Sequence, residues 1–227
     1  MTSALSQLGW VLALGIFTLS VLFLTKLPYD LMVRRGMAPI RAVYYTRKIV
    51  HMVGSGLPTL LVPVVFEDFY YPVLGGVLLG LFVLLTHVTD RRLHWFQIED
   101  NKNDVTFALM WWVSLSVLWW LLGDPWLAIL PGLFMSFGDG ITGVVRNLLV
   151  KRRSKHVLGN VFMLLVSAPL GYWAASQADP ALPGWGLIAA VAASIVERFE
   201  LGPLDDNVLI ALASTGLLLL GATLGPL

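Results

Sequence analysis

The stretch Met135-Ser136-Phe137-Gly138-Asp139-Gly140-Ile141-Thr142-Gly143 places one carboxylate between two glycines near the end of an apolar segment. A carboxylate in lipid costs about 3 kcal/mol on insertion scales, so it normally faces a polar cavity or a charged partner. The glycines remove side-chain bulk, which lets a helix or a ligand approach the backbone closely. A basic cluster, Lys151–Lys155, follows shortly afterwards. Together these features predict a metal–phosphate site at one face of a membrane.

The composition around this stretch is that of a polytopic membrane protein. The chain is 57% hydrophobic and only 13% charged, with a mean hydropathy of +0.78, far from the usage of soluble globular proteins. It has no cysteine, which excludes disulfides, thiolate metal sites and a cysteine nucleophile. A net charge of +1 gives no support for nucleic-acid binding.

The apolar segments predict an all-α fold. With about 20 apolar residues per membrane span, the sequence predicts a bundle of eight transmembrane helices. These helices are expected roughly at residues 5–25, 49–66, 71–88, 105–122, 126–146, 157–176, 185–197 and 207–225. No repeat or soluble segment interrupts the pattern, so residues 1–227 are expected to form a single transmembrane domain.

The distribution of charge predicts the orientation of this bundle. With eight spans, residues 26–48, 89–104, 147–156 and 198–206 face one side. These segments and the adjoining span ends hold all 15 lysines and arginines. The positive-inside rule makes that face cytoplasmic. We therefore expect an integral protein of the cell's cytoplasmic (inner) membrane, with both termini on the non-cytoplasmic side and its active face in the cytoplasm.

Polar residues in two of the predicted spans carry candidate chemistry. Arg47, Lys48 and His51 open the second span, and a basic boundary of this kind is equally typical of a simple topological stop. On a helix Arg47 and His51 share a face, so the functional interpretation has all three facing phosphates. For Asp139 the alternatives are a buried structural carboxylate and a Mg²⁺ ligand, because Mg²⁺ often uses one or two carboxylates plus substrate phosphates.

Two clusters near the last three spans complete the candidate set. Lys151 and Lys155 are typical of topogenic charges that contact anionic lipid. They also precede the small-residue helix start at Gly159 and Asn160, an arrangement suited to anion binding.

The second cluster is an acidic patch where the last two spans meet. It comprises Glu197, Glu200, Asp205, Asp206 and Asn207. At least one of the three consecutive residues 205–207 is expected to cap the final helix. The remaining oxygens are candidates for a second metal ligand or a general base.

In order and spacing, four motifs resemble the polyprenol kinase family. The motifs are Arg47-Lys48-Ile49-Val50-His51, Phe137-Gly138-Asp139-Gly140, the basic run leading to Gly159-Asn160, and Glu197 followed by Asp205-Asp206-Asn207. The family includes dolichol kinase, phytol kinase and the CTP-dependent diacylglycerol kinases, and it is distantly similar to CDP-diacylglycerol synthases. The resemblance covers about residues 45–215.

This resemblance implies transfer of the terminal phosphate of a nucleotide, with CTP favoured, to the hydroxyl of a polyprenol, a phytol-like alcohol or a diacylglycerol. It also implies Mg²⁺ or another divalent cation. On this basis we expect catalytic roles for Asp139, Asp206, Glu197 and His51, and metal ligation by Asp139, Asp205 and Asp206. The expected nucleotide and phosphate ligands are Arg47, Lys48, Gly138, Gly140, Lys151, Lys155, Gly159, Asn160 and Asn207.

One segment departs from the family pattern. Where members usually carry Lys-Ser/Thr-x-Glu-Gly-Ser/Thr, this chain reads Lys155-His156-Val157-Leu158-Gly159-Asn160. Leu158 stands at the glutamate position, so we expect the acidic patch between Glu197 and Asp206 to supply a carboxylate instead. Two other functions stay open on sequence alone: a CDP-lipid cytidylyltransferase, and a non-enzymatic lipid-binding or transport protein of the membrane.

Overall fold

The computed structural model describes residues 3–150, 157–199 and 204–227, and over these ranges the chain is helical, as the sequence predicts. The elements in chain order are α1 (Ala4–Leu24), α2 (Lys26–Arg34), α3 (Pro39–Ile49), η1 (Val50–Gly56), α4 (Leu57–Val65), α5 (Tyr70–Val88), α6 (Asn103–Leu122), α7 (Pro125–Ala128), α8 (Leu130–Leu133), η2 (Phe134–Gly138), α9 (Asp139–Val150), α10 (Val157–Ser176), α11 (Pro183–Val196) and α12 (Asp206–Leu224). The segments η1 and η2 are π-helical turns within longer helices.

Seven of the helical stretches in the described ranges are long and apolar enough to cross a membrane. The remaining predicted span, at residues 185–197, corresponds to α11, which has 14 residues and a length of about 21 Å, short of the roughly 30 Å hydrocarbon core. Helix α11 packs along α10 and α12. Small residues bring it close to α10, because a Cβ on Gly171 would collide with the backbone of Gly186.

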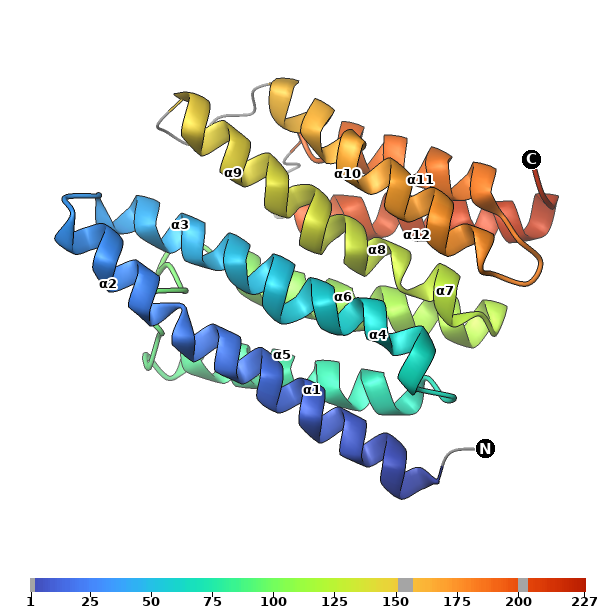
Figure 1. The fold of residues 1–227 in the computed structure, drawn as a ribbon, viewed down its shortest axis with the longest axis horizontal. Helices are drawn as coiled ribbons and strands as arrows, with labels where there is room; N and C mark the ends of the chain where they lie inside the picture. Colours follow the sequence, from blue (N-terminus) through green and yellow to red (C-terminus); the bar gives the residue numbers. More distant parts are fainter. Residues whose placement is uncertain (1–2, 151–156, 200–203) are drawn as a thin grey trace.

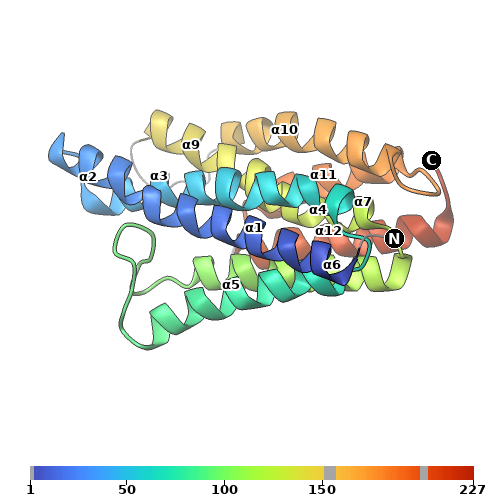
Figure 2. The ribbon, with the colours of Figure 1, turned by 60° about the horizontal axis from the view of Figure 1, so that its bottom comes forward.

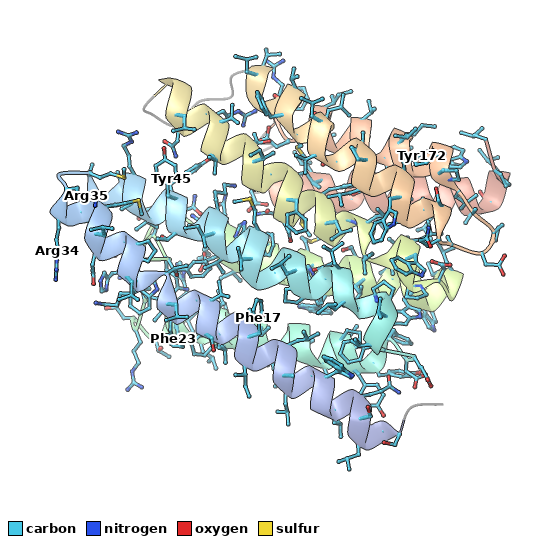
Figure 3. The ribbon with its side chains drawn as sticks, viewed as in Figure 1. Phe17, Phe23, Arg34, Arg35, Tyr45 and Tyr172 are labelled. Atoms are coloured by element: carbon cyan, nitrogen blue, oxygen red, sulfur yellow. The ribbon has the colours of Figure 1, made fainter. Side chains whose placement is uncertain are left out.

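The connections lie at two opposite ends of the bundle. The start of α1 and the end of α12 are at one end, and the turn between α2 and α3 is at the other (Figure 1). The segment between α5 and α6 lies at the same end as α2 (Figure 2). Arg34 and Arg35 mark this end (Figure 3), which we call the basic end.

Large apolar side chains cover the outside of the bundle. Phe17 and Phe23 lie on α1 (Figure 3) and are 40% and 48% exposed. Val64 on α4 is 68% exposed. The interior holds many polar and charged groups, including Lys48, Asp139 and Glu197. Apolar atoms outside and polar groups inside are the pattern of a helical protein that sits in lipid.

The two π-helical turns pack against each other at the centre of the bundle. Ser136 in η2 donates a hydrogen bond to Ser55 in η1 over 3.2 Å, and Gly56 leaves room for the ring of Phe137. A π turn adds a residue to the helical turn and so changes the direction of the side chains that follow it, often beside functional groups. His51 lies within η1, and Asp139 directly follows η2.

Candidate functional site

The Asp139 carboxylate forms a buried ion pair with Lys48. Lys48 Nζ lies 2.6 Å from Asp139 Oδ2, although 91 residues separate the two in sequence, and the residues are only 7% and 4% exposed. Helices α3 and α9 can approach this closely because Gly143, one turn after Asp139, has no side chain. A Cβ there would collide with the Lys48 side chain and lie 2.9 Å from the Tyr44 hydroxyl. Gly143 therefore leaves the space that the Lys48 side chain occupies beside Asp139.

A second buried ion pair lies on the next helices. Arg146 donates to both carboxylate oxygens of Glu197, over 2.6 and 2.7 Å, in the fork geometry that favours arginine. Arg146 also donates to Asn160 Oδ1 over 3.0 Å, while the Asn160 amide donates to Glu197 and to the Ser194 carbonyl. Gly159 makes room for this guanidinium, whose Cζ would be 2.9 Å from an added Cβ.

Three carboxylates from three helices converge beside these pairs. Asp139 begins α9, Glu197 caps the end of α11, and Asp206 begins α12. One oxygen from each lies within 4.8 Å of the others. Mg²⁺ binds oxygen at 2.0–2.1 Å, so opposite ligands on one ion are separated by about 4.2 Å. Three hard oxygens at this spacing fit a small divalent cation after minor side-chain adjustment.

These groups line a polar cavity of about 580 Å³, within the range of small-molecule sites. Its described charged lining consists of four cations and four carboxylates: Arg41, Arg47, Lys48, Arg146, Asp100, Asp139, Glu197 and Asp206. Tyr44, His51 and four asparagines (Asn101, Asn103, Asn147 and Asn207) also line it. The balanced charge means that a bound divalent cation would make the cavity net positive and ready for a polyphosphate.

His51 lies at the inner wall of this cavity. Its ring stacks on Phe107, with centroids 3.9 Å apart and an interplanar angle of 17°. The residue is 3% exposed, and neither ring nitrogen has a hydrogen-bond partner among the described residues. A buried imidazole with two unpaired nitrogens is costly unless a ligand or water supplies the missing partner.

The structure brings most of the predicted site residues together. Arg47, Lys48, His51, Asp139, Glu197, Asp206 and Asn207 all line the cavity, and Asn160 contacts it through Arg146 and Glu197. Lys151 and Lys155 lie outside the described residues. Leu158, at the family glutamate position, is 43% exposed, whereas Gly159 and Asn160 beside it are buried. A carboxylate at 158 would thus point away from the interior, and Glu197 is the acid nearest to Asn160 instead.

Asp205 has a different position from Asp206. Its carboxylate accepts from the backbone N–H of Val208 over 3.1 Å, which caps α12, and from the Thr106 hydroxyl. Burial raises the pKa of Asp205 above its ordinary value, and these two hydrogen bonds oppose the rise. Among the described acids, it is Glu197 that joins Asp139 and Asp206, while Asp205 serves as the helix cap.

The three predicted phosphate-binding glycines lie at helix contacts. A Cβ on Gly138 would be 3.1 Å from Met163 Cγ, one on Gly140 would be 2.5 Å from Met52 Cγ, and Gly159 faces Arg146. None of them is among the described residues that line the cavity. Their absent side chains let η1, η2, α9 and α10 pack closely around the site.

Several cavity-lining residues were not among the predicted site residues, and Arg146 and Tyr44 contact the buried ion pairs most directly. Arg146 was read only as one of the topogenic cations, and Tyr44 was not singled out. A periodic signal for both was present: Arg146 is two helical turns after Asp139, and Tyr44 is one turn before Lys48. Tyr44 also lies under the Lys48 ammonium, with its ring centroid 5.4 Å from Nζ.

Comparisons with protein-family models, with curated proteins and with solved structures found no match for this chain.

Proposed function

We propose that this protein is a membrane lipid kinase that transfers the terminal phosphate of a nucleotide, with CTP favoured, to the hydroxyl of a lipid alcohol. The observation that carries the proposal is the convergence of Asp139, Glu197 and Asp206 beside Lys48 and Arg146 in one cavity of an otherwise apolar bundle. Phosphoryl transfer depends mainly on positioning and on cations that offset the charge of the transferred group. The sequence resemblance to polyprenol kinases supports the same reaction.

Mg²⁺ is the proposed cofactor, and its ligands would be Asp139, Glu197 and Asp206. When bound, it would neutralise nucleotide phosphates and offset charge on the transferred group. Arg47 supports the proposal as a phosphate ligand, because it is buried, lines the cavity and makes only one long hydrogen bond, 3.4 Å to Asn101, in the described ranges. Lys48 lies 2.6 Å from Asp139 and could exchange this partner for a phosphate oxygen.

His51 is the proposed proton acceptor. The lipid hydroxyl oxygen would form a bond to the terminal phosphorus, and the bond from that phosphorus to the nucleoside diphosphate would break. The hydroxyl proton would pass to an unpaired nitrogen of His51, which a neutral imidazole can accept. Asp206 is the alternative acceptor, because it lines the same cavity.

The proposed orientation places the basic end in the cytoplasm, with eight crossings and both termini outside. The cavity is lined by Arg41, Arg47 and Lys48. These three residues belong to the basic segment 26–48, which the positive-inside rule assigns to the cytoplasm. A cytoplasmic nucleotide would then enter from water, and the lipid alcohol would enter from the bilayer.

The test is transfer of radiolabelled phosphate from γ-labelled CTP or ATP to lipid alcohols by the purified protein. We expect a labelled lipid product with the wild type, no product with Asp139→Asn, and full activity with Asp30→Asn. Asp30 is a matched control because its carboxylate pairs with Lys26 outside the cavity. Absence of transfer to every alcohol tested would overturn the kinase proposal.

A cytidylyltransferase is the second candidate, favoured by the same three carboxylates. It would transfer the nucleoside monophosphate part of the nucleotide to the phosphate of a phospholipid and release pyrophosphate, whereas the kinase releases a nucleoside diphosphate. Measuring which of the two products accumulates separates the candidates. If lipid copurifies and neither product forms, a non-enzymatic lipid-binding function is the better description.

A further inference from the structure

An apolar cavity lies next to the polar one. It has a volume of about 130 Å³, is bounded by α1, η1, α4, α5 and α6, and is lined almost entirely by apolar side chains such as Leu14, Leu79 and Phe82. The proposed reaction assigns no role to this space.

The shape of the apolar cavity is long and narrow. Its lining extends along α1 from Val11 to Leu22 and along α5 from Tyr71 to Val83. At 1.5 Å per helical residue these segments are each about 17 Å long. A volume of about 130 Å³ is too small for two hydrocarbon chains to lie side by side over that length.

Polar groups lie at the end of this cavity nearest the basic end. His51 lines both cavities, and Asp104 lines the apolar one. Asp104 is 2% exposed; its Oδ2 accepts from Gln97 over 2.8 Å, while its Oδ1 has no partner among the described residues. Two buried polar side chains with unpaired atoms thus line a mostly apolar space, whose other hydroxyls, on Thr18 and Ser55, have hydrogen-bond partners.

A lipid hydroxyl supplies a missing hydrogen-bond partner to one of these two groups. It donates one hydrogen bond and accepts others, so it can donate to His51 or Asp104 in a place that hydrocarbon alone would leave unsatisfied. Because His51 borders the polar cavity as well, a hydroxyl beside it lies next to the carboxylates and cations described above. A chain filling the apolar cavity therefore presents its head group to the polar cavity.

We infer that the apolar cavity binds the hydrocarbon chain of a single-chain lipid alcohol, with the hydroxyl at His51 and Asp104. This inference rests on the proposed function, which requires an alcohol to reach the polar cavity. It narrows the acceptor to alcohols with one chain, such as isoprenoid or long-chain alcohols, and excludes a two-chain diacylglycerol.

The test is photolabelling of the purified full chain, in lipid nanodiscs, with a diazirine-bearing hexadecanol. Gly15 lines the cavity from α1, and a Cβ on it would meet no atom within 4 Å, so Gly15→Phe fills the cavity without a backbone clash. Gly9 is the matched control, since it lies on the same helix, has equal space and is not among the lining residues. We expect labelling within residues 11–22 and 71–83 to fall at least about tenfold in Gly15→Phe, equivalent to about 1.4 kcal/mol, and to be unchanged in Gly9→Phe.

A second variant and a competition experiment keep the result decisive. Gly75→Phe blocks the cavity from the opposite wall, where an added Cβ would be 3.5 Å from Val11, and the same loss is expected. Unlabelled hexadecanol should displace the probe, whereas a diacylglycerol or phosphatidylcholine should not. Unaltered labelling in both blocking variants, or equal displacement by a two-chain lipid, would overturn the inference.

Photolabelling needs no nucleotide, so it tests the lipid site independently of phosphate transfer. A labelled cavity in a protein that transfers no phosphate would support the lipid site and refute the kinase. Phosphate transfer to a diacylglycerol, unaffected by Gly15→Phe, would support the kinase and refute the lipid site.

Discussion

At the scale of single residues, the Lys48–Asp139 pair sets the energetics of the site. Both groups are buried, and removing one partner of a buried pair leaves an uncompensated charge at a cost of about 3–5 kcal/mol. We therefore expect Lys48→Met to lower the thermal stability of the detergent-solubilised protein markedly. The double variant Lys48→Met/Asp139→Asn should regain much of the loss, because neither charge remains.

The control for this pair is Lys26→Met. Lys26 forms a 3.0 Å pair with Asp30 at a half-exposed surface, where such pairs contribute about 0.3–0.5 kcal/mol. Its effect on the melting temperature should be small. Additive effects of Lys48→Met and Asp139→Asn in the double variant would contradict the interaction inferred from the structure.

Bound metal gives a second prediction about these residues. A ligand that binds only the folded state stabilises it by about 2.7 kcal/mol at a concentration one hundred times its dissociation constant. We expect Mg²⁺ to raise the melting temperature of the wild type, and EDTA to reverse the rise. Asp206→Asn should abolish this response, while Asp205→Asn, which keeps a capping side chain on α12, should retain it. An equal Mg²⁺ response in both variants would rule out the proposed ligand set.

Residue type and hydropathy alone predict several of the residues that line the cavity. A carboxylate inside an apolar segment is rare and needs a polar partner, which singles out Asp139. Arg47, Lys48 and His51 lie close together in sequence on one predicted helix. The partners themselves were not predictable. Lys48 and Asp139 are 91 residues apart, and Arg146 and Glu197 are 51 apart, so their pairing depends on how whole helices pack.

At the scale of elements, close packing of α3 against α9 positions Lys48. Gly143 is the residue that permits it, since a Cβ there would displace the Lys48 side chain and meet Tyr44. We predict that Gly143→Ala reduces phosphate transfer and lowers the melting temperature. Gly216 on α12 is the matched control, because its added Cβ meets nothing within 4 Å.

The control substitution should act in the opposite direction. Alanine in place of an unconstrained helical glycine stabilises by roughly 0.5–1 kcal/mol, so Gly216→Ala is expected to raise the melting temperature slightly and to leave activity unchanged. Parallel assays of both variants separate the intrinsic helix preference from the packing at the site. Equal stabilisation by the two alanines would show that the α3–α9 contact is looser than described.

The predicted helix boundaries agree with the structure for α5 and depart from it at the site. The expected span at 71–88 agrees closely with α5, whereas the expected span at 49–66 belongs to a continuous helix from Pro39 to Val65. The charged residues Arg41, Arg47 and Lys48 lower the hydropathy of the N-terminal part of this helix. They line the polar cavity, so a hydropathy plot places the start of the span too late. The sequence does not predict the π-helical turns η1 and η2, which lie where the two helices contact each other.

At the scale of the whole molecule, the α2–α3 turn and the segment between α5 and α6 lie at one end of the bundle (Figures 1 and 2). Ile98, Asp100 and Asn101 of that segment line the polar cavity, which predicts a testable topology. The chain has no cysteine, so each introduced cysteine is its only thiol. Thr89 follows α5 at the basic end of the bundle, and Gln177 follows α10 at the opposite end. Both residues are exposed and uncharged. In intact cells, a membrane-impermeant maleimide should label Gln177→Cys and should label Thr89→Cys only after permeabilisation. The reverse pattern would put the carboxylates on the outer face, away from cytoplasmic nucleotide, and the kinase proposal would fail with it.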